Sequence, residues 1–153
     1  MTRTRIRLLG EIAVIDGDVA RPPHSRRLQT ILALLAVRAG RIVPADDLID
    51  EAWQDDLPRQ PRAALHIGIT RVRRWLGTSE VGAAPGGYRL DIDPLDVDLL
   101  AFLAATDDAL ETNDRDRRDA AVALWDEPVL PELHSPRLTE VRVLAEARRH
   151  ALG

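Results

Sequence analysis

The sequence of 153 residues contains no cysteine, which excludes disulfide bridges and thiolate chemistry. It also lacks lysine, so all 21 basic side chains are arginine. We attribute this bias to a GC-rich genome rather than to selection for phosphate contacts. Aromatic residues make up only 3% of the chain, so the core must consist mainly of Leu, Val, Ile and Ala. No apolar run approaches the roughly 20 residues of a membrane-spanning helix, and the apolar segment near the N-terminus is too short for a signal peptide. We therefore expect a cytoplasmic protein with no membrane partner.

The residues that are present indicate a folded chain with two differently charged halves. The sequence is 45% hydrophobic and 30% charged, which is typical of globular proteins. Residues 1–92 carry 14 Arg against 11 acidic residues, a net charge of +3. Residues 93–153 carry 7 Arg against 14 acidic residues, a net charge of −7. This asymmetry predicts a mildly basic domain followed by an acidic one.

The first 53 residues have the pattern of a small sheet followed by two helices. β-prone segments separated by turn residues predict strands at 5–9, 12–15 and 19–20. Apolar residues at helical spacing then predict helices over 25–39 and 44–53. Capping and turn residues support these helix limits, namely Ser25 as an N-cap, Gly40 as a stop and Pro44 in a first turn.

The stretch 60–76 is predicted to be a helix, with Pro61 in its first turn and Gly77 just past its end. Its apolar stripe consists of Leu65, Ile69, Val72 and Leu76. At about 100° per residue, the opposite face holds small, polar and arginine side chains that suit a DNA major groove. Taken alone, however, the pattern fits an ordinary solvated surface helix better. The residues on this outer face are Ala63, His66, Ile67, Thr70 and Arg74, flanked by Arg71.

The segment after this helix predicts a β-hairpin. Residues 80–81 are weakly β-prone, 82–87 are rich in turn residues, and 88–92 alternate with period two. The order is therefore a sheet, three helices and a hairpin. This is the organisation of an α+β winged helix-turn-helix with an additional N-terminal sheet, and the hairpin is its wing.

The chain resembles the OmpR-type DNA-binding domain, and more closely that of the SARP family of antibiotic regulatory proteins. Each matching motif is weak alone, but together they occur in the order and spacing of the family. The matching segments are Arg7-Leu8-Leu9-Gly10, Leu32-Ala33-Leu34-Leu35, Arg38-Ala39-Gly40-Arg41, Asp47-Leu48-Ile49-Asp50-Glu51-Ala52-Trp53, Arg71-Val72-Arg73-Arg74-Trp75-Leu76-Gly77 and Gly87-Tyr88-Arg89-Leu90.

The resemblance continues into the acidic half. Asp96-Val97-Asp98-Leu99 and Ala123-Leu124-Trp125 resemble the start of that family's bacterial transcriptional activation domain, a small all-α, tetratricopeptide-like unit. We expect domains at 1–93 and 94–153, with helices over 96–112, 115–125 and 137–152 in the second. Family members carry a longer helical domain, so we expect either a fragment or short form, or an apolar face that awaits a partner. We predict that residues 96–153 pack back on the winged helix or mediate self-association.

The resemblance implies a sequence-specific transcriptional activator of a biosynthetic gene cluster. Such proteins bind direct repeats in double-stranded DNA, associate with one another there and contact RNA polymerase. We expect Ala63, His66, Ile67, Thr70, Arg71 and Arg74 to face bases. We expect Arg26, Arg27, Arg62, Arg73 and Arg89 to meet phosphates.

Two departures from the family leave an alternative open. Ala84 occupies the position where a basic residue often precedes the wing turn and enters the minor groove, so insertion of the wing is in doubt. No phosphoacceptor domain precedes the winged helix, so control by aspartyl phosphorylation is not expected. The alternative is a protein-interaction module whose winged helix has lost DNA binding, favoured by the missing wing arginine and the net acidity of the chain.

No pattern in the sequence indicates an enzyme or a cofactor. The four histidines, at 24, 66, 134 and 150, lack the spacing of metal ligands. Adjacent acidic pairs such as Asp46-Asp47 are better explained as helix caps and solvated surface than as acid–base catalysts. Gly86-Gly87 lacks the helix and lysine that follow in a phosphate-binding loop, so we interpret it as a turn.

Overall fold

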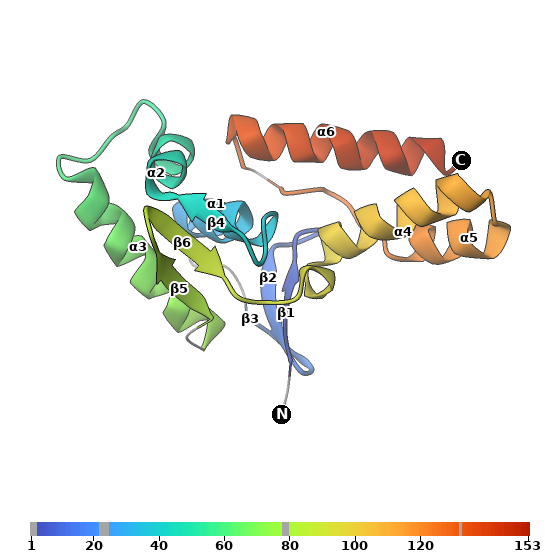
Figure 1. Ribbon diagram of the computed structural model, residues 1–153, viewed down its shortest axis with the longest axis horizontal. Helices are drawn as coiled ribbons and strands as arrows, with labels where there is room; N and C mark the ends of the chain where they lie inside the picture. Colours follow the sequence, from blue (N-terminus) through green and yellow to red (C-terminus); the bar gives the residue numbers. More distant parts are fainter. Residues whose placement is uncertain (1–2, 22–24, 78–79, 132) are drawn as a thin grey trace.

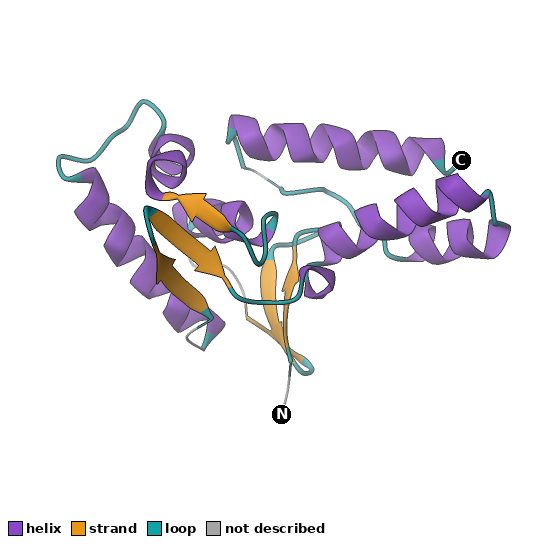
Figure 2. Cartoon of the chain, in the orientation of Figure 1, coloured by secondary structure: helices purple, strands orange, loops and turns teal. Residues whose placement is uncertain are grey.

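The computed structural model describes residues 3–21, 25–77, 80–131 and 133–153. The strands lie in the N-terminal part of the chain, and the part after residue 93 consists of helices and loops (Figure 2). The chain therefore has the mixed α and β content that the sequence predicts for a winged helix. None of the described helices is long and apolar enough to cross a membrane.

The N-terminal sheet is an antiparallel meander of β1 (Thr4–Arg7), β2 (Ala13–Asp16) and β3 (Val19–Arg21). β2 and β3 are joined by a turn at Gly17–Asp18, within the turn residues that separate the predicted strands. The prediction that the first strand runs to Leu9 is wrong. The backbone amides of Leu8 and Leu9 donate to the carboxylate of Asp98 instead of to a neighbouring strand.

Three helices follow, as predicted: α1 (Arg26–Ala36), α2 (Ala45–Trp53) and α3 (Pro61–Leu76). Ser25 is confirmed as the N-cap of α1, where its hydroxyl accepts the Leu28 amide at 3.2 Å. The helix ends at Ala36 rather than at residue 39, because the chain turns there and the amide of Gly40 donates to the carbonyl of Leu90 at 2.8 Å.

A second sheet, in the order β4-β6-β5, forms the wing and its support. It contains β4 (Ile42–Pro44), β5 (Val81–Ala84) and β6 (Gly87–Leu90), all paired antiparallel. No strand is predicted between the first two helices, but Ile42–Pro44 is a strand because it pairs with β6. A side chain at Gly87 would collide with the backbone carbonyl of Val43, so β6 can approach β4 only with glycine at this position.

The C-terminal part contains a single 3-10 turn, η1 (Pro94–Asp96), and the helices α4 (Asp98–Thr112), α5 (Arg115–Ala123) and α6 (Pro136–Ala151). All three predicted helices are therefore present. The predicted helix over 115–125 ends earlier, at Ala123, and α5 packs on α4 through Ala121, which leaves Ala120 and Leu124 exposed. Leu144 in α6 is 44% exposed although it is a large hydrophobic residue.

The helical part packs on the winged part (Figure 1). Val97 bridges Ile6 in parallel, Val129 bridges Leu9, and α6 begins beside α1 and α2. One continuous core of buried apolar residues extends from the N-terminal sheet through α1 to α4 and α6. Of the two predicted outcomes for residues 96–153, packing back on the winged helix is confirmed. Self-association is not tested, and the domain boundary at 93/94 stays a prediction.

Candidate nucleic-acid interface

The buried face of α3 is the apolar stripe that the sequence predicts. Leu65, Ile69, Val72 and Leu76 are each at most 1% exposed. No sequence pattern indicated Gly68, which is buried on the same side. A Cβ at Gly68 would stand 2.9 Å from the side chain of Ile31, so the missing side chain lets α3 lie close against α1. These contacts fix which face of α3 remains available to a ligand.

The opposite face of α3 is exposed along its length. All six predicted base-facing residues lie on it, and Ile67 is 54% exposed despite being a large hydrophobic residue. The Thr70 hydroxyl donates to the carbonyl of His66 at 3.0 Å, so its oxygen remains available as an acceptor. The face therefore offers one apolar contact, several hydrogen-bonding groups and two arginines.

Arg71 and Arg74 are the least constrained cations of this face. Within the described part of the chain, neither guanidinium group has a hydrogen-bond or ion-pair partner. Both line a hollow of about 320 Å³ that Ser25 and Leu28, at the start of α1, close on the other side. Two unpaired positive charges beside a helix N-terminus create a favourable environment for a phosphate oxygen.

Three of the five arginines predicted to contact phosphates are paired with exposed carboxylates. Arg62 lies 3.0 Å from Asp46, and Arg89 lies 2.6 Å from Asp91. Arg27 lies 3.7 Å from Asp56 and also stacks over Trp53, with 5.1 Å between the guanidinium and the ring centroid. Exposed ion pairs of this kind contribute about 0–1 kcal/mol. Exchange of each carboxylate for a phosphate is therefore energetically inexpensive. The fourth, Arg26, is exposed at the start of α1.

Arg73 differs from the other predicted phosphate ligands because it is half-buried. Its Nε donates to the carbonyl of Val81 in β5 at 2.8 Å. The side chain therefore ties α3 to the wing. The predicted phosphate contact stays untested, but any such contact must use the remaining N–H groups of the guanidinium.

The wing tip carries no basic side chain between Ala84 and Gly87. Strands β5 and β6 lie beside α3 (Figure 1), with Arg89 exposed on β6. The nearest wing cation is thus on a strand rather than at the tip.

Arg21, at the end of β3, contacts α3 but was not among the predicted site residues. Its Nη2 donates to the carbonyl of Leu76 at 2.8 Å, and its own carbonyl accepts the indole N–H of Trp75 at 3.3 Å. A sequence pattern gives no indication of this pair because the residues are more than 50 positions apart.

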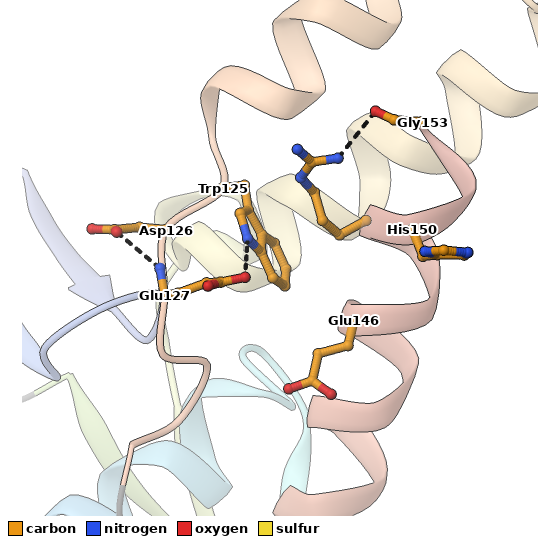
Figure 3. A pocket seen from close by; sticks show the side chains of 7 residues that line it. Trp125, Asp126, Glu127, Glu146, His150 and Gly153 are labelled. Carbon is orange, nitrogen blue, oxygen red and sulfur yellow. Dashed lines mark hydrogen bonds between the residues drawn. The ribbon is translucent and has the colours of Figure 1, made fainter.

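A larger cavity, of about 640 Å³, lies at the far end of the molecule from α3, between the end of α6 and the loop after α5 (Figure 3). The Trp125 indole donates to Glu127 at 3.1 Å, and Arg149 donates to the carbonyl of Gly153 at 3.3 Å. The lining contains both acidic and basic groups and none of the predicted DNA-binding residues. Among the described residues, no cluster of His, Asp or Glu is arranged to hold a metal ion.

Comparisons with known proteins agree with this geometry. Residues 22–90 match the family described as transcriptional regulatory protein, C terminal. The chain is 30% identical over 149 residues to regulatory protein DnrI of Streptomyces peucetius, covering 86% of the chain and 55% of that protein. It is also 30% identical to the transcriptional regulator RedD of Streptomyces coelicolor over 139 residues, covering 82% of the chain and 40% of that protein.

A solved structure shares the fold over nearly the whole chain. It is that of Mycobacterium tuberculosis EmbR in complex with a low-affinity phosphopeptide. The TM-score is 0.86 at 24% identity, over 99% of this chain and 44% of the EmbR chain. The chain spans about half, or less, of the length of these relatives.

Proposed function

Because the chain belongs to the SARP family of regulators, with an OmpR-type winged-helix domain, we propose that it binds double-stranded DNA in a sequence-specific manner and regulates transcription. The observation that carries this proposal is the outer face of α3, which is exposed along its length and bears the unpaired Arg71 and Arg74. A DNA-binding role places the protein in the cytoplasm.

The physical argument starts from the two faces of α3. The buried stripe holds the helix against α1, so the opposite face is presented as a rigid surface of helical width. A B-DNA major groove is about 12 Å wide and admits one α-helix. Ile67 suits the methyl group of thymine, whereas His66 and Thr70 suit hydrogen bonds to base edges. The two arginines add contacts to guanine or to phosphate.

The charge distribution sets the expected strength of binding. The basic surplus of residues 1–92 is only +3, and residues 93–153 carry −7. Non-specific affinity, which depends on neutralised phosphates, is therefore expected to be weak. With no cation at the wing tip, discrimination between sequences depends mainly on α3.

Four finer parts of the proposal rest on the family. The protein is an activator of a biosynthetic gene cluster, binds promoter direct repeats head to tail, and contacts RNA polymerase. The helices α4–α6 are the start of a tetratricopeptide-like activation domain. Copies on one face of B-DNA must recur about every 10–11 bp, so we propose repeats at that spacing. We also propose that the protein forms little dimer in solution.

The second candidate is a protein-interaction module without DNA binding. The acidic C-terminal part and the wing tip without a basic residue favour it. Under this function the outer face of α3 would contact a protein partner, and duplex DNA would bind with no preference among sequences.

A mobility-shift experiment on the promoter region next to the protein's own gene tests the proposal. We expect a shift that an unlabelled copy of the site removes and a scrambled duplex of equal length does not. Equal competition by both duplexes would favour the interaction module. At a site with direct repeats, insertion of about 5 bp between them rotates one copy by half a turn and should abolish cooperative binding. Unchanged cooperativity would disprove the head-to-tail arrangement.

A further inference from the structure

The C-terminal end of α3 is covered by the guanidinium group of Arg21 from the N-terminal sheet. Its Nη2 lies 2.8 Å from the carbonyl oxygen of Leu76 and 3.5 Å from the carboxylate of Asp16. We propose that Arg21 is a positioning residue for base recognition, which fixes the recognition helix against the N-terminal sheet. This inference rests on the proposed function of α3.

The chemistry of a helix end makes Arg21 an effective anchor. The last carbonyl groups of a helix have no partner within the helix and carry the negative end of its dipole. A cationic N–H donor satisfies such a carbonyl with a charge-assisted bond, which is shorter and stronger than a neutral one. The side chain of Arg21 is only 31% exposed, so water competes poorly for the Leu76 carbonyl.

The contact involves three consecutive residues at the end of α3. The indole N–H of Trp75, which is 2% exposed, donates to the backbone carbonyl of Arg21 at 3.3 Å. Gly77 ends the helix with φ of +73°, and a Cβ there would stand 2.5 Å from Nη1 of Arg21. The guanidinium group thus occupies the space that a side chain at residue 77 would fill.

Arg21 is matched by a second tie on the other side of the helix. Arg73 donates to Val81 in β5, so α3 is held by the N-terminal sheet through one arginine and by the wing through another. Both ties act on the last turn, whereas His66, Ile67 and Thr70 lie one to three turns earlier. A shift or tilt at the anchored end would displace all of these side chains together from their base edges.

The test compares arginine variants of one sheet on DNA. Arg21→Met keeps the aliphatic stem and removes every donor, and Arg21→Lys keeps the charge and one donor group. Arg5→Met is the matched control, because Arg5 is exposed on β1 and its side chain has no partner among the described residues. The readout is the ratio of affinities for the preferred site and for a scrambled duplex of equal length.

We expect Arg21→Met to lower this ratio about tenfold, equivalent to about 1.4 kcal/mol, and Arg21→Lys to restore most of it. Arg5→Met should weaken both affinities alike and leave the ratio unchanged. A ratio for Arg21→Met that matches the wild type or the Arg5→Met control would overturn the proposal.

Hydrogen exchange separates this proposal from the proposed function. Amides in the last turn of α3 should exchange about tenfold faster in Arg21→Met than in Arg5→Met, because the helix end opens more readily. Should the wild type prefer no DNA sequence, the proposed function fails, and the exchange comparison still decides whether Arg21 holds the helix. If Arg21→Met does not fold, the test uses Arg21→Lys, in which the last turn of α3 must exchange faster than in the Arg5→Met control. Exchange equal to that control would overturn the positioning role.

Discussion

At the scale of single residues, the arginines of the candidate interface differ mainly in what they contact. Arg71 and Arg74 have no partner among the described residues, Arg62 and Arg89 pair with exposed carboxylates, and Arg73 is bound to a backbone carbonyl. A charge that already has a rigid partner is less available to DNA than an unpaired one. All of these residues are arginines in the sequence, so only the fold shows which of them are available to DNA.

Ile67 and Thr70 provide the sharpest test of base recognition. A lost base contact costs about 1–3 kcal/mol at one operator position and leaves the salt dependence unchanged. We expect Ile67→Ala and Thr70→Ala each to relax preference at one or two base pairs. The measurement is a set of binding isotherms on the preferred site and on single mismatches at several salt concentrations.

The chain offers matched controls for both substitutions. Leu57 is 55% exposed in the loop before α3, which is nearly the same exposure as that of Ile67. The Thr112 hydroxyl donates to the carbonyl of Asp108, four residues earlier, as the Thr70 hydroxyl does to His66. Leu57→Ala and Thr112→Ala should leave all mismatch penalties unchanged. If the α3 variants behave like these controls, this face does not read bases.

At the scale of elements, the sequence predicted the type and order of the helices and strands better than their ends. Helical periodicity placed α1, α2 and α3 because the buried stripes are local patterns. The ends depend on distant partners: β1 stops at Arg7 because Asp98 binds the next two amides, and Ile42–Pro44 is a strand because β6 lies beside it. A local pattern contains no record of such partners.

The tie between α3 and the wing tests how two elements share one arginine. We expect Arg73→Ala to weaken specific and non-specific binding in parallel and to lower the salt slope by about one unit, as for a lost phosphate contact. Arg73→Lys keeps the charge and should retain the slope. Faster hydrogen exchange in β5 of both variants would report the lost bond to Val81. Arg115→Ala, an exposed arginine of α5, is the control for net charge alone.

Binding isotherms at four or more salt concentrations give the slope for each variant. A slope for Arg73→Ala equal to that of the wild type, together with faster exchange in β5, would mean that Arg73 only supports the wing. Equal slopes for Arg73→Ala and Arg115→Ala would attribute the change to net charge rather than to a contact.

At the scale of the whole molecule, polar contacts connect the two oppositely charged parts, among them contacts at two places that bear on stability. At one, Arg137 lies 3.1 Å from Asp47 and the Ser135 hydroxyl donates to Glu51 at 2.7 Å, which joins the start of α6 to α2. At the other, Asp98 binds the chain after β1. The sequence indicated that the helical part would pack back or self-associate, but pairs of residues 80–90 positions apart leave no periodic signal that could locate these contacts.

The second place gives stability a dependence on pH. The carboxylate of Asp98 accepts the amides of Leu8 and Leu99 at 2.7 Å each and that of Leu9 at 3.1 Å. Burial disfavours the charge, and although these N–H groups and nearby Arg7 oppose it, the net effect raises the pKa of Asp98 from 3.8 to about 6. The protonated form is therefore more favoured in the folded state than in the unfolded state. Its contribution to stability is complete below pH 3.8 and is lost as pH rises through about 6.

This sign leads to a prediction for Asp98→Asn, in which residue 98 is neutral at every pH. Each pKa unit corresponds to about 1.4 kcal/mol, and the unfolded carboxyl is already partly ionised at pH 4, so the wild type should lose about 2 kcal/mol of unfolding free energy relative to the variant between pH 4 and 7. A constant offset from the altered hydrogen bonds cancels, because only the change with pH is compared. Denaturant unfolding of wild type, Asp98→Asn and the exposed control Asp119→Asn across that range measures the difference. Parallel curves for wild type and Asp98→Asn would show that folding leaves the pKa of Asp98 unchanged, and hence that its three backbone donors offset its burial.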